Sequence, residues 1–232
     1  MEEIQETSLK NIDFYNEISI KYDQILDEET SNETVRKRVK EKFIDLVKPG
    51  YVLDFGGGTG RDLYWLIDHQ YQVVFCEPSE GMRKKAIDQY VQHPLKSNIT
   101  FLDNPQIDFS NWHIIPPFTR KVDAILSDFA VINCIADIEL LFKNLAQLIK
   151  PGGHVLALML NNRYKKTWRW KLKELSRSLS GKTEIIHIQH NHYQQIVHLY
   201  SKKKVIKAAA PWFECHSQEN LFEFTLFHFT RK

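Results

Sequence analysis

The stretch Tyr51-Val-Leu-Asp-Phe-Gly-Gly-Gly-Thr-Gly-Arg61 joins an apolar run to four glycines within five positions. We predict a β-strand in the apolar run, a tight turn at the glycines and a helix after the turn. Glycine permits a sharp turn and a close approach of the backbone to a ligand, and the N–H groups at the start of the helix stay free. The stretch therefore predicts a nucleotide-binding turn, with a ligand-free glycine turn as the alternative.

The spacing of the glycines excludes two common nucleotide fingerprints. The dinucleotide pattern G-x-G-x-x-G requires glycine where Arg61 stands, and the phosphate-loop pattern requires a Gly-Lys pair, which does not follow. The pattern present is Asp54-x-Gly56-x-Gly58-x-Gly60, with a carboxylate in the strand. An acidic group at this place suits a ligand that carries an ammonium group rather than a pyrophosphate.

This pattern resembles motif I of the class I S-adenosylmethionine-dependent methyltransferases. The resemblance covers roughly residues 14–160 and includes Leu-Ile-Lys-Pro-Gly-Gly-x-Val at residues 148–155, another signature of that family. Glu77 ends the second expected strand, 19 positions after Gly58. An acidic group at that spacing can accept both ribose hydroxyls of a nucleoside, which strengthens the resemblance.

The resemblance also implies a set of cofactor-binding residues. Tyr22 belongs to a Tyr-Asp pair that often lies over the cofactor, and Met82 to an acidic-x-Ser-x-x-Met segment near the adenine; core packing is the alternative for both. Asp103 would accept a hydrogen bond from the adenine amine, and Asp108 is the alternative residue for this role. Asp128 ends the strand that faces the reactive methyl group. The implied set is Tyr22, Asp54, Gly56, Gly58, Gly60, Glu77, Met82, Asp103 and Asp128.

Element order predicts an α/β fold. Apolar runs at 51–55, 72–76, 98–102, 121–127 and 154–160 alternate with helical patterns such as 137–150. This alternation predicts a doubly wound, mostly parallel sheet with helices on both faces and a ligand at the carboxyl ends of the strands. The resemblance implies the seven-stranded, Rossmann-like methyltransferase fold, with strand order 3-2-1-4-5-7-6 and an antiparallel seventh strand.

We predict a single methyltransferase domain over residues 1–232, because no composition break divides the chain. Its four expected parts are a lid of two helices (1–50), a cofactor-binding core (51–160), an inserted cap (161–200), and a C-terminal helix with an antiparallel hairpin (201–232). The cap should contain a helix over 164–179 and two strands over 184–190 and 193–200. The final hairpin should pair 212–216 with 221–230.

Cysteine usage and hydropathy predict a cytoplasmic protein. The three cysteines, Cys76, Cys134 and Cys215, are widely spaced and form no C-x-x-C pattern, which argues against a disulfide framework or a thiolate zinc site. The N-terminus lacks an apolar leader, and no run of 18 apolar residues occurs. We therefore expect neither secretion nor a membrane span.

Candidate catalytic residues lie around the expected cap. Methyl transfer from a sulfonium requires positioning of donor and acceptor, plus a base if the acceptor carries a proton. Histidine suits that task near neutral pH, so His187 and His198 are candidate bases, and Asn133 is a candidate for orienting the acceptor. His190 and His192 lie in the same segment, but no carboxylate or cysteine accompanies them, and we expect no metal site.

Positive charge is concentrated late in the chain, where residues 161–207 hold twelve Lys or Arg and two acids. Such a segment suits an acidic small molecule, a nucleic-acid backbone or solvent alone. We predict an enzyme that moves the methyl group of S-adenosylmethionine to an O or N atom of a small-molecule acceptor and leaves S-adenosylhomocysteine. The alternatives are an RNA-directed methyltransferase and an inactive S-adenosylmethionine-binding partner protein.

Overall fold

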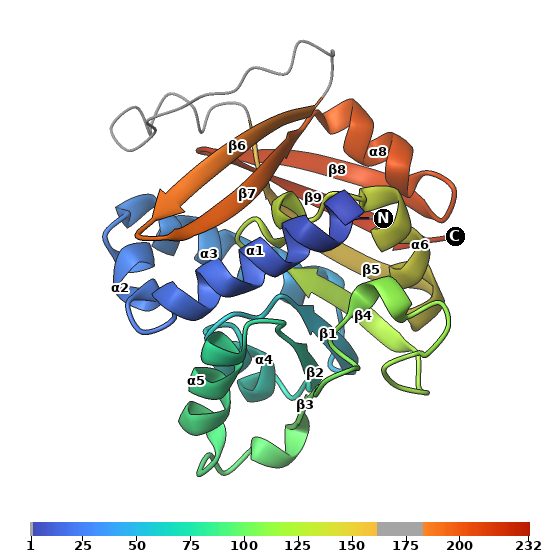
Figure 1. Ribbon diagram of the computed structural model, residues 1–232. Helices are drawn as coiled ribbons and strands as arrows, with labels where there is room; N and C mark the ends of the chain where they lie inside the picture. Colours follow the sequence, from blue (N-terminus) through green and yellow to red (C-terminus); the bar gives the residue numbers. More distant parts are fainter. Residues whose placement is uncertain (1, 162–182) are drawn as a thin grey trace.

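The computed structural model describes residues 2–161 and 183–232. Its centre is a seven-stranded sheet of order β3-β2-β1-β4-β5-β9-β8 (Figure 1). Strands β1 to β5 are parallel, and β9 is antiparallel to both of its neighbours. The predicted fold class and strand order are therefore confirmed. The strands are β1 (Tyr51–Phe55), β2 (Gln72–Cys76), β3 (Ile99–Phe101), β4 (Val122–Ser127), β5 (Ile149–Leu160), β8 (Phe213–Leu221) and β9 (Phe224–Arg231).

Helices cover both faces of this sheet. Leu53 and Ile125 share a buried cluster with residues of α6 and α8, whereas Val52 and Ala124 share another with residues of α3, α4 and α5. Neighbouring residues of one strand thus reach opposite faces, as the pleat requires, and the near-continuous apolar runs in the sequence reflect burial on both sides. The helices are α3 (Thr30–Leu46), α4 (Leu63–Asp68), α5 (Glu80–Tyr90), α6 (Ile138–Leu148) and α8 (Lys202–Ala209).

The N-terminal region contains three helices, not the two that we predicted. Helices α1 (Glu2–Ile18) and α2 (Tyr22–Asp27) precede α3. The chain breaks between α1 and α2 because the Ser19 hydroxyl donates to the carbonyl oxygen of Asn16 at 2.8 Å, an alternative to helical backbone bonding. The apolar spacing had run through this break, so sequence periodicity alone did not reveal it.

A separate two-stranded sheet, β6 (Thr183–His190) and β7 (Tyr193–Tyr200), lies across the carboxyl ends of the main strands. Its two strands match the prediction, while the helix predicted over 164–179 lies outside the described residues. Ile186, Val197 and Leu199 pack with Leu160 at the end of β5, so this face of the hairpin points inward. Helix α1 lies beside β7 (Figure 1). We call α1 together with β6 and β7 the roof.

The last strands differ from the prediction at their boundaries. Strand β8 extends to Leu221 instead of ending at His216, because it is an edge strand in which exposed polar residues alternate with partly buried ones. Strand β5 starts at Ile149, before the Pro-Gly-Gly segment rather than after it. None of the helices in the described part of the chain combines the length and apolar character needed to cross a bilayer.

Candidate cofactor and acceptor site

The glycine turn is closely packed at most of its positions. Gly56, Gly58 and Gly60 have φ angles of +76°, +59° and +82°, which favour glycine. A Cβ atom on Gly57 would lie 2.2 Å from the Phe75 ring and 2.6 Å from Asp54 Oδ2. A Cβ atom on Gly58 would meet only the ring of Tyr22, at 3.8 Å. The turn is therefore least crowded at Gly58, with the Tyr22 ring beside it.

Polar side chains from two neighbouring strands end beside this turn without partners. Asp54 Oδ2 on β1, and Ser127 Oγ and Asp128 Oδ2 at the end of β4, are buried and have no hydrogen-bond partner among the described residues. Burial raises the pKa of Asp54 well above its usual range, and the nearby carboxylates of Asp62, Asp128 and Glu77 add to this effect. Buried polar atoms are normally satisfied, so these oxygens mark a place for a ligand with donors or positive charge.

Glu77 lies directly at the turn. Its carboxylate accepts a hydrogen bond from Gly58 N at 2.9 Å and another from Ser79 N at 2.7 Å. Burial raises the pKa of Glu77 to about 7, although these two hydrogen bonds favour the ionised form. Gly58 and Glu77 are 19 positions apart, so the spacing noted in the sequence corresponds to a direct hydrogen bond between the glycine turn after β1 and the end of β2.

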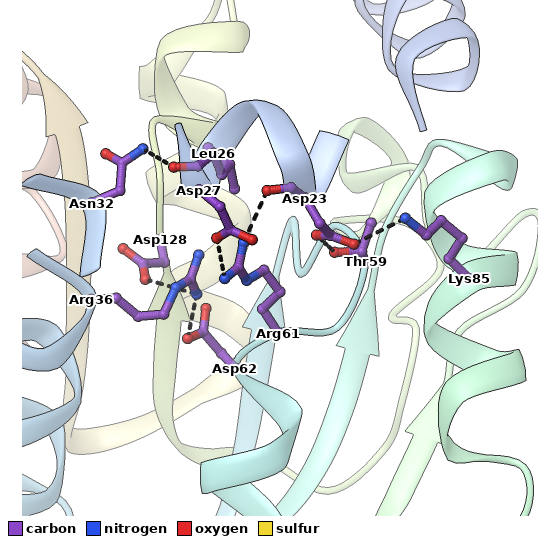
Figure 2. A network of polar contacts seen from close by, with 10 residues as sticks. All are labelled: Asp23, Leu26, Asp27, Asn32, Arg36, Thr59, Arg61, Asp62, Lys85 and Asp128. Atoms are coloured by element: carbon purple, nitrogen blue, oxygen red, sulfur yellow. Dashed lines mark hydrogen bonds and ion pairs between the residues drawn. The ribbon is translucent and has the colours of Figure 1, made fainter. Parts of the chain in front are cut away.

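A partly buried arginine that the sequence did not reveal connects the N-terminal helices to this acidic group (Figure 2). Arg36 Nη1 on α3 lies 2.7 Å from Asp62 Oδ1 and 3.8 Å from Asp128 Oδ2, and the guanidinium lies 4.4 Å from the centre of the Phe129 ring. Burial and the charge of Asp62 raise the pKa of Asp128. Arg36 is one of many basic residues in its helix, so nothing in the sequence distinguishes it.

Helix α2 is fixed to the glycine turn by further polar contacts (Figure 2). Thr59 Oγ1 donates to Asp23 Oδ1 at 2.6 Å, and Lys85 Nζ binds the other oxygen of Asp23 at 2.9 Å. Arg61 Nη2 lies 2.7 Å from Asp27 Oδ1. These contacts hold Tyr22, the first residue of α2, against the turn.

Two predicted adenine-side residues have different environments. Met82 is buried and packs against Phe14 and Ile18, which is the core role that the sequence left open. Asp103 is exposed, and no described residue binds its carboxylate. Its rival Asp108 instead caps a short 3-10 helix, η2 (Phe109–Asn111), by accepting from Ser110 N. Between the two carboxylates, Asp103 is the one available to a ligand.

The predicted catalytic histidines lie on the β6–β7 hairpin, one on each strand. In the β6–β7 register, His187 pairs with Ile196 and Ile185 pairs with His198, so both imidazoles lie on one face of the hairpin. Ile186, Ile188 and Val197 form the opposite face, which packs inward. Burial lowers the pKa of His198 to about 4. His187 Nδ1 and His198 Nε2 are buried and have no hydrogen-bond partner among the described residues, and a role for either histidine as the base stays a prediction.

The Asn133 side chain is hydrogen-bonded to backbone groups of β5 and β7. It lies in a 3-10 helix, η3 (Val131–Cys134), which follows β4. Its amide donates to the carbonyl oxygen of His198 at 2.8 Å, and its Oδ1 accepts from Leu160 N at 2.9 Å. The side chain thus connects the end of β5 to β7, which explains its complete burial but leaves its amide bound to backbone groups rather than facing an acceptor.

The structure reveals a polar cluster that we did not predict. The side chains of Tyr15 on α1, Cys134 on η3 and Gln195 on β7 lie within hydrogen-bonding distance of one another. Tyr15 precedes Cys134 by 119 residues and Gln195 by 180 residues along the chain. No local motif could have joined them. Within residues 2–161 and 183–232, no group of three or more His, Cys, Asp or Glu is arranged to bind a metal ion.

The chain resembles two curated methyltransferases over about half of its length. It is 32% identical over 111 residues to the tRNA 5-carboxymethoxyuridine methyltransferase of Escherichia coli (strain K12), a match covering 48% of this chain and 40% of that protein. It is 31% identical over 124 residues to an uncharacterised methyltransferase of Geobacillus kaustophilus, covering 53% of each.

Solved structures share the fold over most of the chain. The 1,6-didemethyltoxoflavin-N1-methyltransferase of Burkholderia thailandensis has a TM-score of 0.71 at 13% identity, covering 99% of this chain and 90% of the other. A protein of Pyrococcus horikoshii OT3 has a TM-score of 0.67 at 20% identity, covering 89% and 94%.

A family model described as a methyltransferase domain matches residues 28–208, which is more than half of the chain. That span includes the glycine turn, the buried acids at the strand ends and the inward face of the hairpin. With the strand order observed here, the match identifies the chain as a member of the class I S-adenosylmethionine-dependent methyltransferase family.

Proposed function

We propose that this methyltransferase transfers the methyl group of S-adenosylmethionine to an oxygen or nitrogen atom of a small-molecule acceptor. The observation that carries the proposal is a set of buried oxygens on Asp54, Ser127 and Asp128, beside an open Gly58, that lack a hydrogen-bond partner among the described residues. Cationic groups would relieve the repulsion among these acids, and S-adenosylmethionine carries both an ammonium and a sulfonium group.

The proposed cofactor contacts follow from the chemistry of the side chains. Asp54 would bind the ammonium group, Glu77 the ribose hydroxyls, and Asp103 the adenine amine, while the backbone at Gly58 approaches the ligand closely. When bound, the cofactor supplies an activated methyl group. The protein then positions the acceptor in line and excludes water with its roof. Asn133 has a positioning role in this proposal, because it holds β7 over the strand ends.

The enclosure of the site favours a small acceptor. Helix α1 and the inward face of β6–β7 cover the strand ends with buried side chains such as Phe14 and Val197. One structural relative carries 1,6-didemethyltoxoflavin in its printed name, which supports a small-molecule acceptor by analogy of fold. An acidic small molecule, which the late basic segment favours, is the alternative acceptor within this class.

An RNA acceptor is the second candidate, for two reasons. The curated relative at 32% identity is named for a modified uridine in tRNA. The same late basic segment is the kind that neutralises phosphates. An inactive S-adenosylmethionine-binding partner protein is the third possibility.

Two measurements test the proposal. Calorimetric titration of the purified chain with S-adenosylmethionine should give binding, and a folded protein that binds none would refute the proposal. Labelled methyl groups should then enter a small-molecule extract but not purified tRNA. Incorporation into tRNA alone would favour the RNA alternative, and no incorporation despite binding would favour the inactive one.

A pair of variants tests the role of Asp54. Asp54→Asn should weaken S-adenosylmethionine but leave the affinity for 5′-methylthioadenosine, which lacks the ammonium group, nearly unchanged. Asp68→Asn, at an exposed position on α4, is the matched control and should bind both ligands normally. Equal weakening of both ligands by Asp54→Asn would contradict an ammonium contact.

A further inference from the structure

We propose that Tyr15, Cys134 and Gln195 form the subsite that selects the methyl acceptor, and that it takes an uncharged aromatic ring bearing a hydrogen-bond donor, such as a phenolic hydroxyl or a ring N–H. This inference rests on the proposed methyl transfer to a small molecule. It names a recognition site and an acceptor class for that reaction.

The three side chains form one hydrogen-bonding group. Gln195 Nε2 donates to the Tyr15 hydroxyl at 2.7 Å and lies 3.5 Å from Cys134 Sγ, and the Tyr15 hydroxyl lies 3.7 Å from the same sulfur. No residue in the described part of the chain donates to Gln195 Oε1, which leaves that oxygen as an acceptor for a ligand. Cys134 and Gln195 are partly exposed, so the group is not sealed in the core.

The group is adjacent to the cofactor turn but belongs to different elements. The Tyr22 ring would lie 3.8 Å from a Cβ atom on Gly58, and it packs edge-to-face with the Tyr15 ring, with centroids 6.0 Å apart. Helix η3, which carries Cys134, packs on the turn through Val131, whose Cγ1 would lie 2.4 Å from a Cβ on Gly56. The cluster therefore lies one aromatic ring beyond the proposed cofactor site, where an acceptor must approach.

Chemistry determines the class of acceptor. None of the three side chains carries a formal charge, and no charged side chain among the described residues forms a hydrogen bond with them. Burial raises the pKa of the Tyr15 hydroxyl and of the Cys134 thiol, so both stay protonated near neutral pH. Phe14 and Tyr22 both meet Tyr15 edge-to-face. An uncharged ring with a donor matches these aromatic surfaces and the free Gln195 oxygen, whereas a charged acceptor would have no counterion in the cluster.

Asn11 holds the cluster in place. Its side-chain amide donates to the carbonyl oxygens of Cys134 at 2.9 Å and Ile196 at 3.0 Å, and its Oδ1 accepts from Ile196 N at 2.7 Å. Tyr15 lies one helical turn beyond Asn11 on the same face of α1, and Gln195 precedes Ile196. One buried amide thus sets the separation of the three elements that carry the cluster, and the site is organised before an acceptor arrives.

Two neighbouring glutamines provide the test. Gln195→Leu and Tyr15→Phe should each lower the initial rate of labelled methyl transfer into a dilute small-molecule extract by roughly three- to tenfold, the loss of one neutral hydrogen bond. Calorimetric affinity for S-adenosylmethionine should not change. Gln194→Leu, on the opposite face of the same strand, should transfer at the parent rate. Parent rates in both test variants, or parallel loss of cofactor affinity, would overturn the assignment.

A chemical probe tests the charge preference independently of any acceptor. With S-adenosylhomocysteine bound, neutral methyl methanethiosulfonate should modify Cys134 faster than its anionic sulfonatoethyl or cationic trimethylammonioethyl analogue. Cys215, which is partly exposed on β8, provides the reference rates in the same chain. Equal or faster modification of Cys134 by a charged reagent, corrected by Cys215, would overturn the preference. Failure of the parent chain to bind S-adenosylmethionine would instead refute the proposed function.

Discussion

The cofactor side, meaning the glycine turn and the acids at the ends of β1 and β4, differs from the roof in how its buried polar groups are hydrogen-bonded. At the strand ends of β1 and β4, buried oxygens of Asp54, Ser127 and Asp128 have no hydrogen-bond partner among the described residues. Where the roof meets η3, the buried amide of Asn11 has three partners. Unsatisfied buried groups cost stability and are maintained where a ligand completes them, whereas satisfied groups stabilise the fold itself. The difference distinguishes the part of the site that binds from the part that positions.

The largest expected effect concerns Arg36, which lies beside the buried acids Asp62 and Asp128. Arg36→Ala leaves Asp62 and Asp128 buried near each other without a cation, which should cost about 3–5 kcal/mol of unfolding free energy. Urea denaturation measures the change. Arg38→Ala, which removes a more exposed pair with Glu219, is the matched control and should cost less than about 1 kcal/mol. Equal costs would mean that the buried acids do not depend on Arg36.

The pH dependence of stability should have opposite signs in the two regions. Glu77 has its pKa raised from 4.5 to about 7, so the folded state binds more protons and loses stability as pH rises through that window, by up to about 3 kcal/mol. His198 on the roof has its pKa lowered from 6.5 to about 4, so the unfolded state binds more protons and stability is lost as pH falls from 6.5 to 4.

Two variants separate these contributions. Glu77→Gln should flatten the loss of stability with rising pH, and His198→Gln should flatten the loss toward acid pH, both measured by urea denaturation without ligand from pH 4 to 8. Glu80→Gln, at an exposed position on α5, serves as the control. A slope unchanged in Glu77→Gln would show that Glu77 titrates as in the unfolded chain.

Loss of the Asn11 side chain should lower the local stability of the roof and leave the local stability of β1 unchanged. Asn11→Ala removes three hydrogen bonds and leaves Ile196 N unsatisfied, for a cost of about 2 kcal/mol. Amide hydrogen exchange should increase in α1 and β7 but not in β1. Asp13→Ala, at an exposed position on the same helix, should leave exchange unchanged. Equal exchange increases in β1 would contradict the independence of the two regions.

The smallest expected effect is on cofactor affinity. Glu77→Gln should weaken S-adenosylmethionine by about tenfold, because a charged hydrogen-bond acceptor is replaced by a neutral one. Calorimetry at pH 8, where the carboxylate is ionised, measures the change. An affinity equal to that of the parent chain would exclude Glu77 from the proposed ribose contact.

The sequence predicted the parts of the site whose contacting residues lie close together along the chain. Gly58 and Glu77 meet at the ends of two adjacent parallel strands, so their short separation in sequence indicated the turn, whereas the strand order followed from the family resemblance. Asn11, Tyr15 and Gln195 meet only after the fold brings distant segments together, and each is an ordinary residue in its own segment. The face of a hairpin on which His187 and His198 lie depends on its register and packing, which composition does not encode, so the sequence alone could not place them.

Asn11 also has a consequence for how this chain is made. The carbonyl groups that Asn11 binds lie 123 and 185 residues downstream. Helix α1 therefore emerges from the ribosome long before η3 and β7, against which it packs, have been synthesised. The sheet strands β1 to β5 can associate first, since each pairs with segments synthesised shortly before or after it. Closing the roof therefore belongs to the last stage of folding, and a nascent chain acquires its acceptor subsite only once β7 has been translated.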